Sequence, residues 1–345
     1  MTLRIGFLGA GLIARYHVDA LARSGADAVV VAVHDPDRGR AEDLAARCGA
    51  TVAADETALL DAVDAVYVCT WTSEHPRLVA AAADRGLAVF CEKPLGVDLA
   101  AATAVARSVA DAAVVNQVGL VLRDAPALLA LRHLVQRPTS GPVLAVVFRD
   151  DQYLPTGGMY ASTWRGDVAR AGAGTLLEHS IHDLDLLEWL VGPVERIGAR
   201  TRRVHGLDGI EDVAVVTLDH AGGAVSALTS VWHDVLSRPS QRRIEVLCQR
   251  AWCCLEGEVD GPVRWVDGDE DATGSALAGA DLRAWVRDQV GPLRWPDAGF
   301  VEAAAAGRPA RPDVATALRA HVLADAAYRS AADGGAPVPV PPLTG

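Results

Sequence analysis

Lysine is almost absent from this chain. Of its 32 basic residues one is a lysine, Lys93, and the others are arginines. Long apolar runs are missing too, because none approaches the ~20 residues that a membrane-spanning helix needs. The first residues, MTLRIGFLGAG, lack the basic segment and cleavage site of a signal peptide and have the pattern of a strand. We therefore expect a cytoplasmic protein without a membrane partner.

Positive charge and cysteine motifs are also scarce. The chain has 44 acidic and 32 basic residues, and its net charge of −12 argues against nucleic acid or an anionic membrane as a partner. None of the six cysteines forms a C-x-x-C pair, so the sequence indicates neither a zinc site nor a disulfide framework. We expect buried thiols.

Short apolar runs alternate with helical stretches over the first third of the chain. The predicted strands cover residues 3–8, 29–33, 65–69, 88–91 and 113–118, and the predicted helices cover 12–23, 37–48, 75–85 and 98–110. Such alternation is typical of a parallel sheet with helices on both faces.

The pattern changes after residue 122. A helix at 126–136 is followed by extended runs at 143–153, 194–204, 212–219, 223–233, 242–248 and 251–256, interrupted by one helix near 174–190. Helices at 279–289, 298–306 and 312–333 precede an irregular tail at 334–345. We expect an α/β protein with two domains: an N-terminal domain (1–122) with a parallel sheet covered on both faces, and a C-terminal α+β domain (123–345) with a large, mostly antiparallel sheet.

The first strand runs into a G-x-G-x-x-A motif. Gly9 would allow a tight turn, Gly11 would let the backbone approach a pyrophosphate, and Ala14 would let the helix pack closely on the strand. Asp35 ends the second strand, 24 residues after Gly11, where a carboxylate can bind the ribose hydroxyls of NAD. Arg38 lies nearby and would soften that preference, which keeps NADP as the alternative. The other interpretation is a plain glycine turn with a solvated aspartate.

Lys93 follows the strand at 88–91, at its carboxyl end. Ligands of open parallel sheets bind outside those ends. A lysine there can donate a hydrogen bond to a substrate hydroxyl, stabilise the developing alkoxide, and have its pKa tuned in a way that arginine cannot. An ordinary surface lysine is the alternative, and it fits poorly in a chain that uses arginine at every other basic position.

A second group of polar residues lies in the predicted helix at 174–190. Glu178, His182 and Asp185 are spaced i, i+4 and i+7, which would place them on one helical face. A histidine with a carboxylate one turn away suits general acid–base catalysis. Two alternatives stay open: a metal cluster built on Glu178, His179 and His182, and a structural histidine pair. We expect no metal site, because no motif for a third ligand is present.

Taken together, these residues resemble the Gfo/Idh/MocA oxidoreductase family, which is named for glucose–fructose oxidoreductase, inositol dehydrogenase and a rhizopine-catabolism protein. The resemblance covers nearly the whole chain, and it implies an N-terminal NAD(P)-binding Rossmann domain and a C-terminal substrate-binding domain with an open sheet. It rests on Gly9-Ala10-Gly11-Leu12-Ile13-Ala14, Asp35, Thr70-Trp71-Thr72-Ser73-Glu74-His75, Glu92-Lys93-Pro94, Val118-Gly119-Leu120-Val121-Leu122-Arg123-Asp124-Ala125-Pro126, Trp164-Arg165, residues 172–185 and Ala326-Ala327-Tyr328-Arg329-Ser330.

The resemblance implies roles for individual residues. Lys93 and His182 match the catalytic lysine and histidine, and Glu178 stands where the family usually has aspartate. The implied cofactor contacts are Gly9, Gly11, Leu12, Ile13, Asp35, Arg38, Thr70, Thr72, His75, Glu92, Lys93, Gln117, Trp164 and Arg165. The implied substrate contacts are Lys93, Arg123, Trp164, Glu178, His179 and His182. Trp71 departs from the proline that is common in its loop, and the open sheet implies a homodimer or homotetramer.

The expected reaction is the reversible oxidation of a secondary alcohol on a small polyhydroxylated ring, such as a sugar, inositol, aminocyclitol or aminoglycoside. His182 would take the hydroxyl proton, Lys93 would stabilise the oxyanion, and Glu178 would orient His182 or a neighbouring hydroxyl. Two rival functions keep the same fold: a redox-cycling, NAD-dependent glycoside hydrolase, and a non-catalytic NAD(P)-binding sensor.

Overall fold

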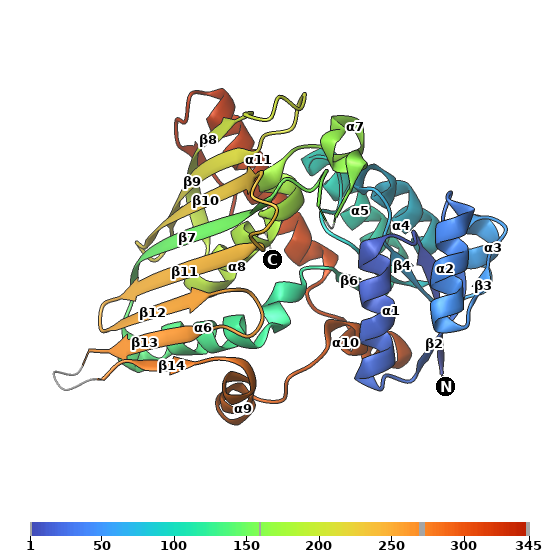
Figure 1. The fold of residues 1–345 in the computed structure, drawn as a ribbon, viewed down its shortest axis with the longest axis horizontal. Helices are drawn as coiled ribbons and strands as arrows, with labels where there is room; N and C mark the ends of the chain where they lie inside the picture. The colour runs from blue at the N-terminus through green and yellow to red at the C-terminus, as the bar shows by residue number, and fades with distance from the viewer. Residues whose placement is uncertain (1, 159, 269–272, 343–345) are drawn as a thin grey trace. The chain divides into compact units, whose positions relative to one another are not determined.

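The computed structural model describes residues 2–158, 160–268 and 273–342. The chain divides into two compact units (Figure 1). The first comprises Met1–Val121, Ala169–Ala171 and Arg294–Leu318, and the second comprises Leu122–Val168, Gly172–Leu293 and Arg319–Gly345. Residues 294–318 were expected in the second domain. They belong to the first unit because Phe300 and Val301 of their helix are buried in its core.

The first unit is a doubly wound sheet. Its strands are β1 (Leu3–Leu8), β2 (Ala28–His34), β3 (Thr51–Val52), β4 (Ala65–Val68), β5 (Ala88–Cys91) and β6 (Asn116–Val118). In the described part of the chain they lie in the order β3-β2-β1-β4-β5-β6, and every neighbouring pair is parallel. The helices are α1 (Leu12–Ser24), α2 (Arg38–Cys48), α3 (Glu56–Leu60), α4 (His75–Ala83), α5 (Leu99–Ala112) and α10 (Pro296–Ala306). The expected Rossmann fold is confirmed, although β3 and α3 were too short to be predicted.

Successive side chains along each strand point to opposite faces of this sheet, and each face has its own hydrophobic core. On β4, Ala65 and Tyr67 pack in one hydrophobic cluster, whereas Val66 and Val68 pack in the other. Because helices cover both faces, the central strands are apolar at consecutive positions. The chain order reverses between β1 and β4. The carboxyl ends of the strands beside that point form the usual ligand edge of an open α/β sheet.

The second unit is built on a larger sheet. Its strands are β7 (Val143–Tyr153), β8 (Val194–Arg202), β9 (Val213–His220), β10 (Val225–His233), β11 (Gln241–Cys248), β12 (Ala251–Glu256), β13 (Val263–Asp267), β14 (Ser275–Leu277) and β15 (Val338–Pro339). Among the described residues the order is β14-β13-β12-β11-β7-β10-β9-β8-β15, with one parallel pair, β7–β10. This confirms the mostly antiparallel sheet, whereas the short strands β13, β14 and β15 were not predicted.

Helices cover one face of this sheet (Figure 1). They are α6 (Pro126–Gln136), α8 (Ile181–Val191), α9 (Gly279–Gln289) and α11 (Val314–Ala332), of which α11 enters the unit at Arg319. Leu131 of α6 and Leu187 of α8 are buried in the same cluster as Phe148 of β7. In the described part of the chain, no helix combines the length and apolar character needed to cross a membrane.

The predicted helix at 174–190 is interrupted, which corrects the sequence analysis. Residues Thr175–His179 form a π-helical turn, Ser180 follows it, and α8 begins at Ile181. The Ser180 N–H donates to the Thr175 carbonyl at 2.8 Å, a five-residue step that widens the turn. The uniform helical spacing assumed for Glu178 and His182 therefore does not hold, and the two do not share the face of one α-helix.

Interactions with the sheet explain the interruption. The Glu211 carboxylate accepts the backbone N–H groups of Gly174 (2.8 Å) and Leu176 (2.9 Å). Ser230 of β10 is hydrogen-bonded to Thr175 and, through its Oγ at 2.6 Å, to Ser180. The bonds with Glu211 satisfy backbone N–H groups that a regular helix would leave unpaired at its start, and those with Ser230 tie the side chains of Thr175 and Ser180 to β10.

Candidate active site

The glycine turn of the first unit has the geometry of a dinucleotide site. Gly9 has φ +92°, and a Cβ there would lie 2.5 Å from the Cys69 carbonyl oxygen, so a side chain is excluded. A Cβ at Gly11 would meet nothing within 4 Å. Gly11 caps α1 without a side-chain hydrogen bond, so the first-turn N–H groups face open space. This arrangement fits the pyrophosphate of a dinucleotide.

Two apolar side chains at the start of α1 are unusually exposed. Leu12 is 52% exposed and Ile13 is 38% exposed, although both belong to the first turn of a helix that packs on the sheet. Exposed apolar side chains beside an open helix N-terminus are well placed to be covered by a bound cofactor. The predicted contacts at Leu12 and Ile13 are compatible with this placement.

Asp35 is fixed beside the same turn. Its carboxylate accepts the Ala10 N–H at 2.7 Å through Oδ2 and the Asp37 N–H at 2.8 Å through Oδ1. Each oxygen keeps a lone pair for a ribose hydroxyl. Arg38 is strongly exposed and paired with Glu42 at 2.8 Å, one helical turn away. The residues present fit NAD, because a carboxylate at this point repels a 2′-phosphate.

The loop after β4 is tied to the turn that carries Lys93. His75 is buried and its Nδ1 lies 2.8 Å from the Pro94 carbonyl, to which it donates. Burial lowers the pKa of His75, which favours the neutral ring. Thr72 is buried beside it, and Nε2 of His75 lies 3.4 Å from the Thr70 carbonyl oxygen. Their contacts with the cofactor stay predictions.

Trp71 is covered by a cation. The guanidinium of Arg170 lies 3.9 Å from the centroid of its ring, within the first unit. This stacking is a cation–π contact, which arginine makes readily through its planar face. Trp71, which stands where the family commonly has proline, thus packs against Arg170.

Lys93 is half-buried immediately after β5, and its neighbour Glu92 is buried. Glu92 Oε2 accepts the Lys93 N–H at 3.2 Å, and Glu92 Oε1 lies 2.9 Å from Nε2 of His17. Burial would raise the pKa of Glu92, but its hydrogen bond with His17 and the charges of His17 and Lys93 keep it below its usual range. His17 was not predicted as a site residue.

The other unpredicted member of this group is Asp297, which precedes Phe300 on α10. Its Oδ1 lies 2.7 Å from Nδ1 of His17. Gln117, a predicted cofactor contact, is buried near the same helix and donates to the Pro296 carbonyl at 3.0 Å. The sequence signal for His17 is a weak one: it is a polar residue on the apolar, buried face of α1, next to Val18 and between Ala14 and Leu21.

Several predicted site residues lie in the second unit. Arg165 donates to Glu178 Oε1 at 2.5 Å, and its guanidinium lies 4.8 Å from the Trp164 ring centroid. Glu178 is thus held by a cation, and Trp164 packs on that cation. His182 is the second residue of α8 and is 8% exposed. The structure unites Arg165, Trp164 and Glu178, while the predicted orientation of His182 by Glu178 stays a prediction.

His179 faces a buried ion network. Its Nε2 lies 3.0 Å from Asp150 Oδ2 on β7. Arg242 of β11 binds Asp150 (3.2 Å) and Asp183 (2.8 Å), and all three side chains are buried. Burial raises the pKa of Asp183 to about 7 despite the neighbouring arginine. In the parts of the chain that are described, no three His, Cys, Asp or Glu side chains are grouped to hold a metal ion.

Arg123 is engaged by another carboxylate. It donates to both oxygens of Asp185, at 2.7 and 2.6 Å, and lies over the Trp189 ring at 5.7 Å. A bidentate pair of this kind fixes the plane of the guanidinium. The predicted substrate contact of Arg123 stays a prediction, and Asp185, which was expected on the face of His182, pairs with Arg123.

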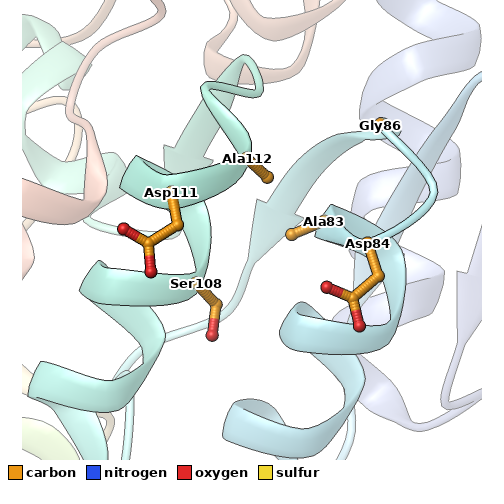
Figure 2. Close-up of a pocket in the computed structure, with 6 residues that line it drawn as sticks. All are labelled: Ala83, Asp84, Gly86, Ser108, Asp111 and Ala112. Carbon is orange, nitrogen blue, oxygen red and sulfur yellow. The ribbon is translucent and has the colours of Figure 1, made fainter.

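A hollow on the first unit lies away from these residues. Figure 2 shows it between the ends of α4 and α5, lined by Ala83, Asp84, Gly86, Ser108, Asp111 and Ala112. Both helices end here, just before β5 and β6 begin. The hollow is therefore at the amino ends of the parallel strands, opposite the edge where dinucleotides bind.

A doubly wound sheet with an open glycine turn and an acid after its second strand defines a dinucleotide-binding protein, here joined to an α+β unit. Residues 3–120 match the family model described as "Oxidoreductase family, NAD-binding Rossmann fold", and residues 128–253 match the GFO/IDH/MocA C-terminal domain. The chain belongs to the Gfo/Idh/MocA family. It is an oxidoreductase, and its cofactor is NAD, as expected from the sequence.

Known proteins resemble it over different lengths. Inositol 2-dehydrogenase of Paracoccus denitrificans (strain Pd 1222) is 30% identical over 99% of this chain and 97% of that protein. Inositol 2-dehydrogenase of Rhizobium meliloti (strain 1021) is 32% identical over 56% of each chain, so this match spans little more than half of the relative. A levoglucosan dehydrogenase in complex with NADH and levoglucosan superposes with a TM-score of 0.86 at 20% identity, over 99% of this chain and 100% of that one. At that identity the likeness establishes the fold.

Proposed function

We propose that this enzyme oxidises a secondary hydroxyl on the ring of an inositol, an aminocyclitol or a related sugar, with NAD as the oxidant. The observation that carries the proposal is the only lysine of the chain, Lys93, at the carboxyl end of β5 beside a dinucleotide turn. The names of the two inositol 2-dehydrogenases support the substrate class. The net charge of −12 favours a substrate that carries an amino group.

The chemistry divides between the cofactor and two side chains. When bound, NAD supplies the acceptor for the hydride that leaves the hydroxyl-bearing carbon. His182 takes the hydroxyl proton as general base, and the Lys93 ammonium donates a hydrogen bond to the oxygen as negative charge develops on it. Glu178, held by Arg165, orients His182 or a neighbouring hydroxyl of the ring. In the reverse direction the protonated His182 returns the proton as general acid, and Lys93 stabilises negative charge on the same oxygen.

NAD is proposed over NADP because of the charges at the end of β2. Asp35 is fixed beside the glycine turn by two backbone N–H groups, so its carboxylate cannot turn away from a 2′-phosphate. Arg38 could attract that phosphate, but its guanidinium is already paired with Glu42. We further propose a cytoplasmic location, where the six free thiols of the chain stay reduced.

Replacing the two catalytic groups tests the assignment. Lys93→Arg and His182→Ala should each lower kcat by about 100-fold or more. Binding of NADH, followed by its fluorescence, should stay within about threefold of the wild type because neither change alters the glycine turn. His220→Ala is the matched control: His220 is also a buried histidine of the second unit, hydrogen-bonded to Gly192 and Ser226. Normal turnover of both variants would reject the assignment.

We also propose a homodimer or homotetramer that forms through the uncovered face of the large sheet. Val147, Val215, Val225 and Leu247 alternate with buried residues on β7, β9, β10 and β11, and each is 40–52% exposed. Light scattering should show a dimer or tetramer, and Val147→Asp should yield a monomer. A monomeric wild type would contradict this part of the proposal.

A further inference from the structure

A buried histidine links three segments of the first unit. His17 of α1 is fully buried, with Nδ1 2.7 Å from Asp297 Oδ1 on α10 and Nε2 2.9 Å from Glu92 Oε1 after β5. Glu92 follows His17 by 75 residues in the chain, and Asp297 follows it by 280. None of the motifs of the glycine turn or of the Lys93 turn includes His17 or Asp297.

The partners of His17 define its charge. Both ring nitrogens face carboxylate oxygens, which accept hydrogen bonds and do not donate them when ionised. Both nitrogens must therefore donate, which requires the protonated imidazolium. Burial alone would lower the pKa of His17, but the hydrogen bonds with Asp297 and Glu92 outweigh it and raise the pKa to about 9. The histidine thus stays charged at neutral pH.

Glu92 transmits the position of this ring to Lys93. While Oε1 is bound by His17, Oε2 accepts the backbone N–H of Lys93 at 3.2 Å. Gly119 closes the space behind the carboxylate, since a Cβ at that glycine would lie 2.3 Å from Glu92 Oε1. The Glu92 side chain is therefore confined. The hydrogen bond that its carboxylate accepts from the Lys93 N–H depends on the position in which His17 holds that carboxylate.

The ring of His17 is itself confined. Its centroid lies 4.8 Å from that of Phe90 and 5.4 Å from that of Tyr67, both on strands of the sheet. The ring is thus held between α1 and the sheet, in contact with Glu92. The N-terminus of α1 is the end that follows the glycine turn.

We propose that His17 is a positioning residue that couples the cofactor-binding helix α1 to the turn that presents Lys93. The inference rests on the proposed function in one respect, because it treats Lys93 as a catalytic group. It predicts that occupation of the dinucleotide site changes the surroundings of Lys93, and that this change passes through the bonds of His17 with Glu92 and Asp297. A purely structural histidine would stabilise the fold without altering the response of Lys93.

The solitary lysine makes the coupling directly observable. Protein labelled with ¹³C-lysine contains one lysine side chain, so its NMR signal reports on Lys93 alone. In the wild type we expect the signal to shift when NADH is added. In His17→Gln the signal of the free protein should be displaced, and the shift caused by NADH should fall to about half or less, with the Kd for NADH within about threefold. His220→Gln, which removes a buried histidine of the second unit, should respond as the wild type does.

A second variant keeps the test decisive if His17→Gln does not fold. Asp297→Asn removes one carboxylate from His17 without touching Lys93, and it should displace the Lys93 signal in the same direction by a smaller amount. An unchanged Lys93 signal and an unchanged response to NADH in whichever variant folds would overturn the proposal.

Turnover separates this inference from the proposed function. With an active substrate, His17→Gln should lower kcat by about tenfold while the KM for NAD changes by less than about threefold. A lower melting temperature with unchanged kcat would mean a structural role only. If the wild type turns over none of the polyhydroxylated rings but its Lys93 signal responds as described, the proposed function fails and the coupling stands. If the enzyme is active and the signal does not respond, the reverse holds.

Discussion

Raising the pH from about 7.5 to about 10 should remove the stabilisation that protonated His17 gives to the first unit. The ordinary pKa of histidine is 6.5, and the folded protein raises it to about 9. A group whose pKa is raised by folding stabilises the protein fully below the unfolded pKa, and that contribution disappears as the pH rises through the folded value. The loss is therefore expected in the window above neutral pH, not below it.

The size of the effect follows from the two pKa values. Each unit of difference is worth about 1.4 kcal/mol, and most of the difference between 6.5 and about 9 is still present at pH 7.5. The protonated His17 should thus contribute about 2 kcal/mol at that pH and almost nothing at pH 10. The group has little exposed surface, so solvent screening does not reduce the value appreciably.

Urea unfolding of the wild type and His17→Gln over this pH range measures the contribution. Other buried groups lose stability in the same window, because burial raises the pKa values of Cys69, Cys91 and Tyr67. These groups are common to both proteins, so the quantity of interest is the difference between the two free energies of unfolding. It should shrink by about 2 kcal/mol from pH 7.5 to pH 10. A difference that does not change with pH would refute the assignment of the charge to His17.

Three further changes test other parts of the structure. Gly9→Ala should destabilise the protein by about 2 kcal/mol or more and weaken NADH binding, because the new Cβ meets the Cys69 carbonyl. The control Gly25→Ala, at φ +70° in open space, should cost about 1 kcal/mol. Equal costs of the two changes in urea unfolding would contradict the steric argument. Asp35→Asn should lower the preference for NAD over NADP by about tenfold in kcat/KM, and an unchanged ratio would show that another group reads the ribose. Arg242→Met should lower the free energy of unfolding by about 3–5 kcal/mol, because it removes the cation that binds the buried Asp183 carboxylate. Calorimetry would show this loss as a lower Tm, whereas the loss of a surface ion pair would change the Tm little.

The features that could be predicted are those that depend on neighbours in the sequence. The glycine turn follows directly from the first strand, and Asp35 ends the second, so their positions at one edge of the sheet follow from the parallel topology. Lys93 stood out through composition alone, since the chain has no other lysine. Helix α6 begins and ends where its apolar spacing and Pro126 indicated.

The features that could not be predicted depend on contacts between distant residues. The apolar spacing from Leu176 to Leu187 is compatible with one continuous helix. The break at Ser180 follows from bonds with Glu211, just before β9, and with Ser230 of β10, which are both distant in the sequence. Likewise, nothing near Arg123 in the sequence identifies Asp185 as its partner.

The site shows the same limit. Glu178 was expected to orient His182 by helical spacing, and that spacing gives no sign of its ion pair with Arg165, thirteen residues earlier in a separate turn. His17 was overlooked because a histidine in an apolar stripe has no distinctive local motif. Its importance comes from Asp297, which the topology brings back from 280 residues away.

The central claim is that this enzyme transfers a hydride from a ring hydroxyl to NAD. It is tested most directly by the absorbance of reduced nicotinamide when the wild-type protein and NAD are mixed with inositols, aminocyclitols, free sugars and aminoglycosides in turn. We expect one class of ring to produce a steady rise that Lys93→Arg abolishes. No rise with any ring, in protein that holds nicotinamide tightly and cleaves a glycoside without net reduction, would contradict the claim.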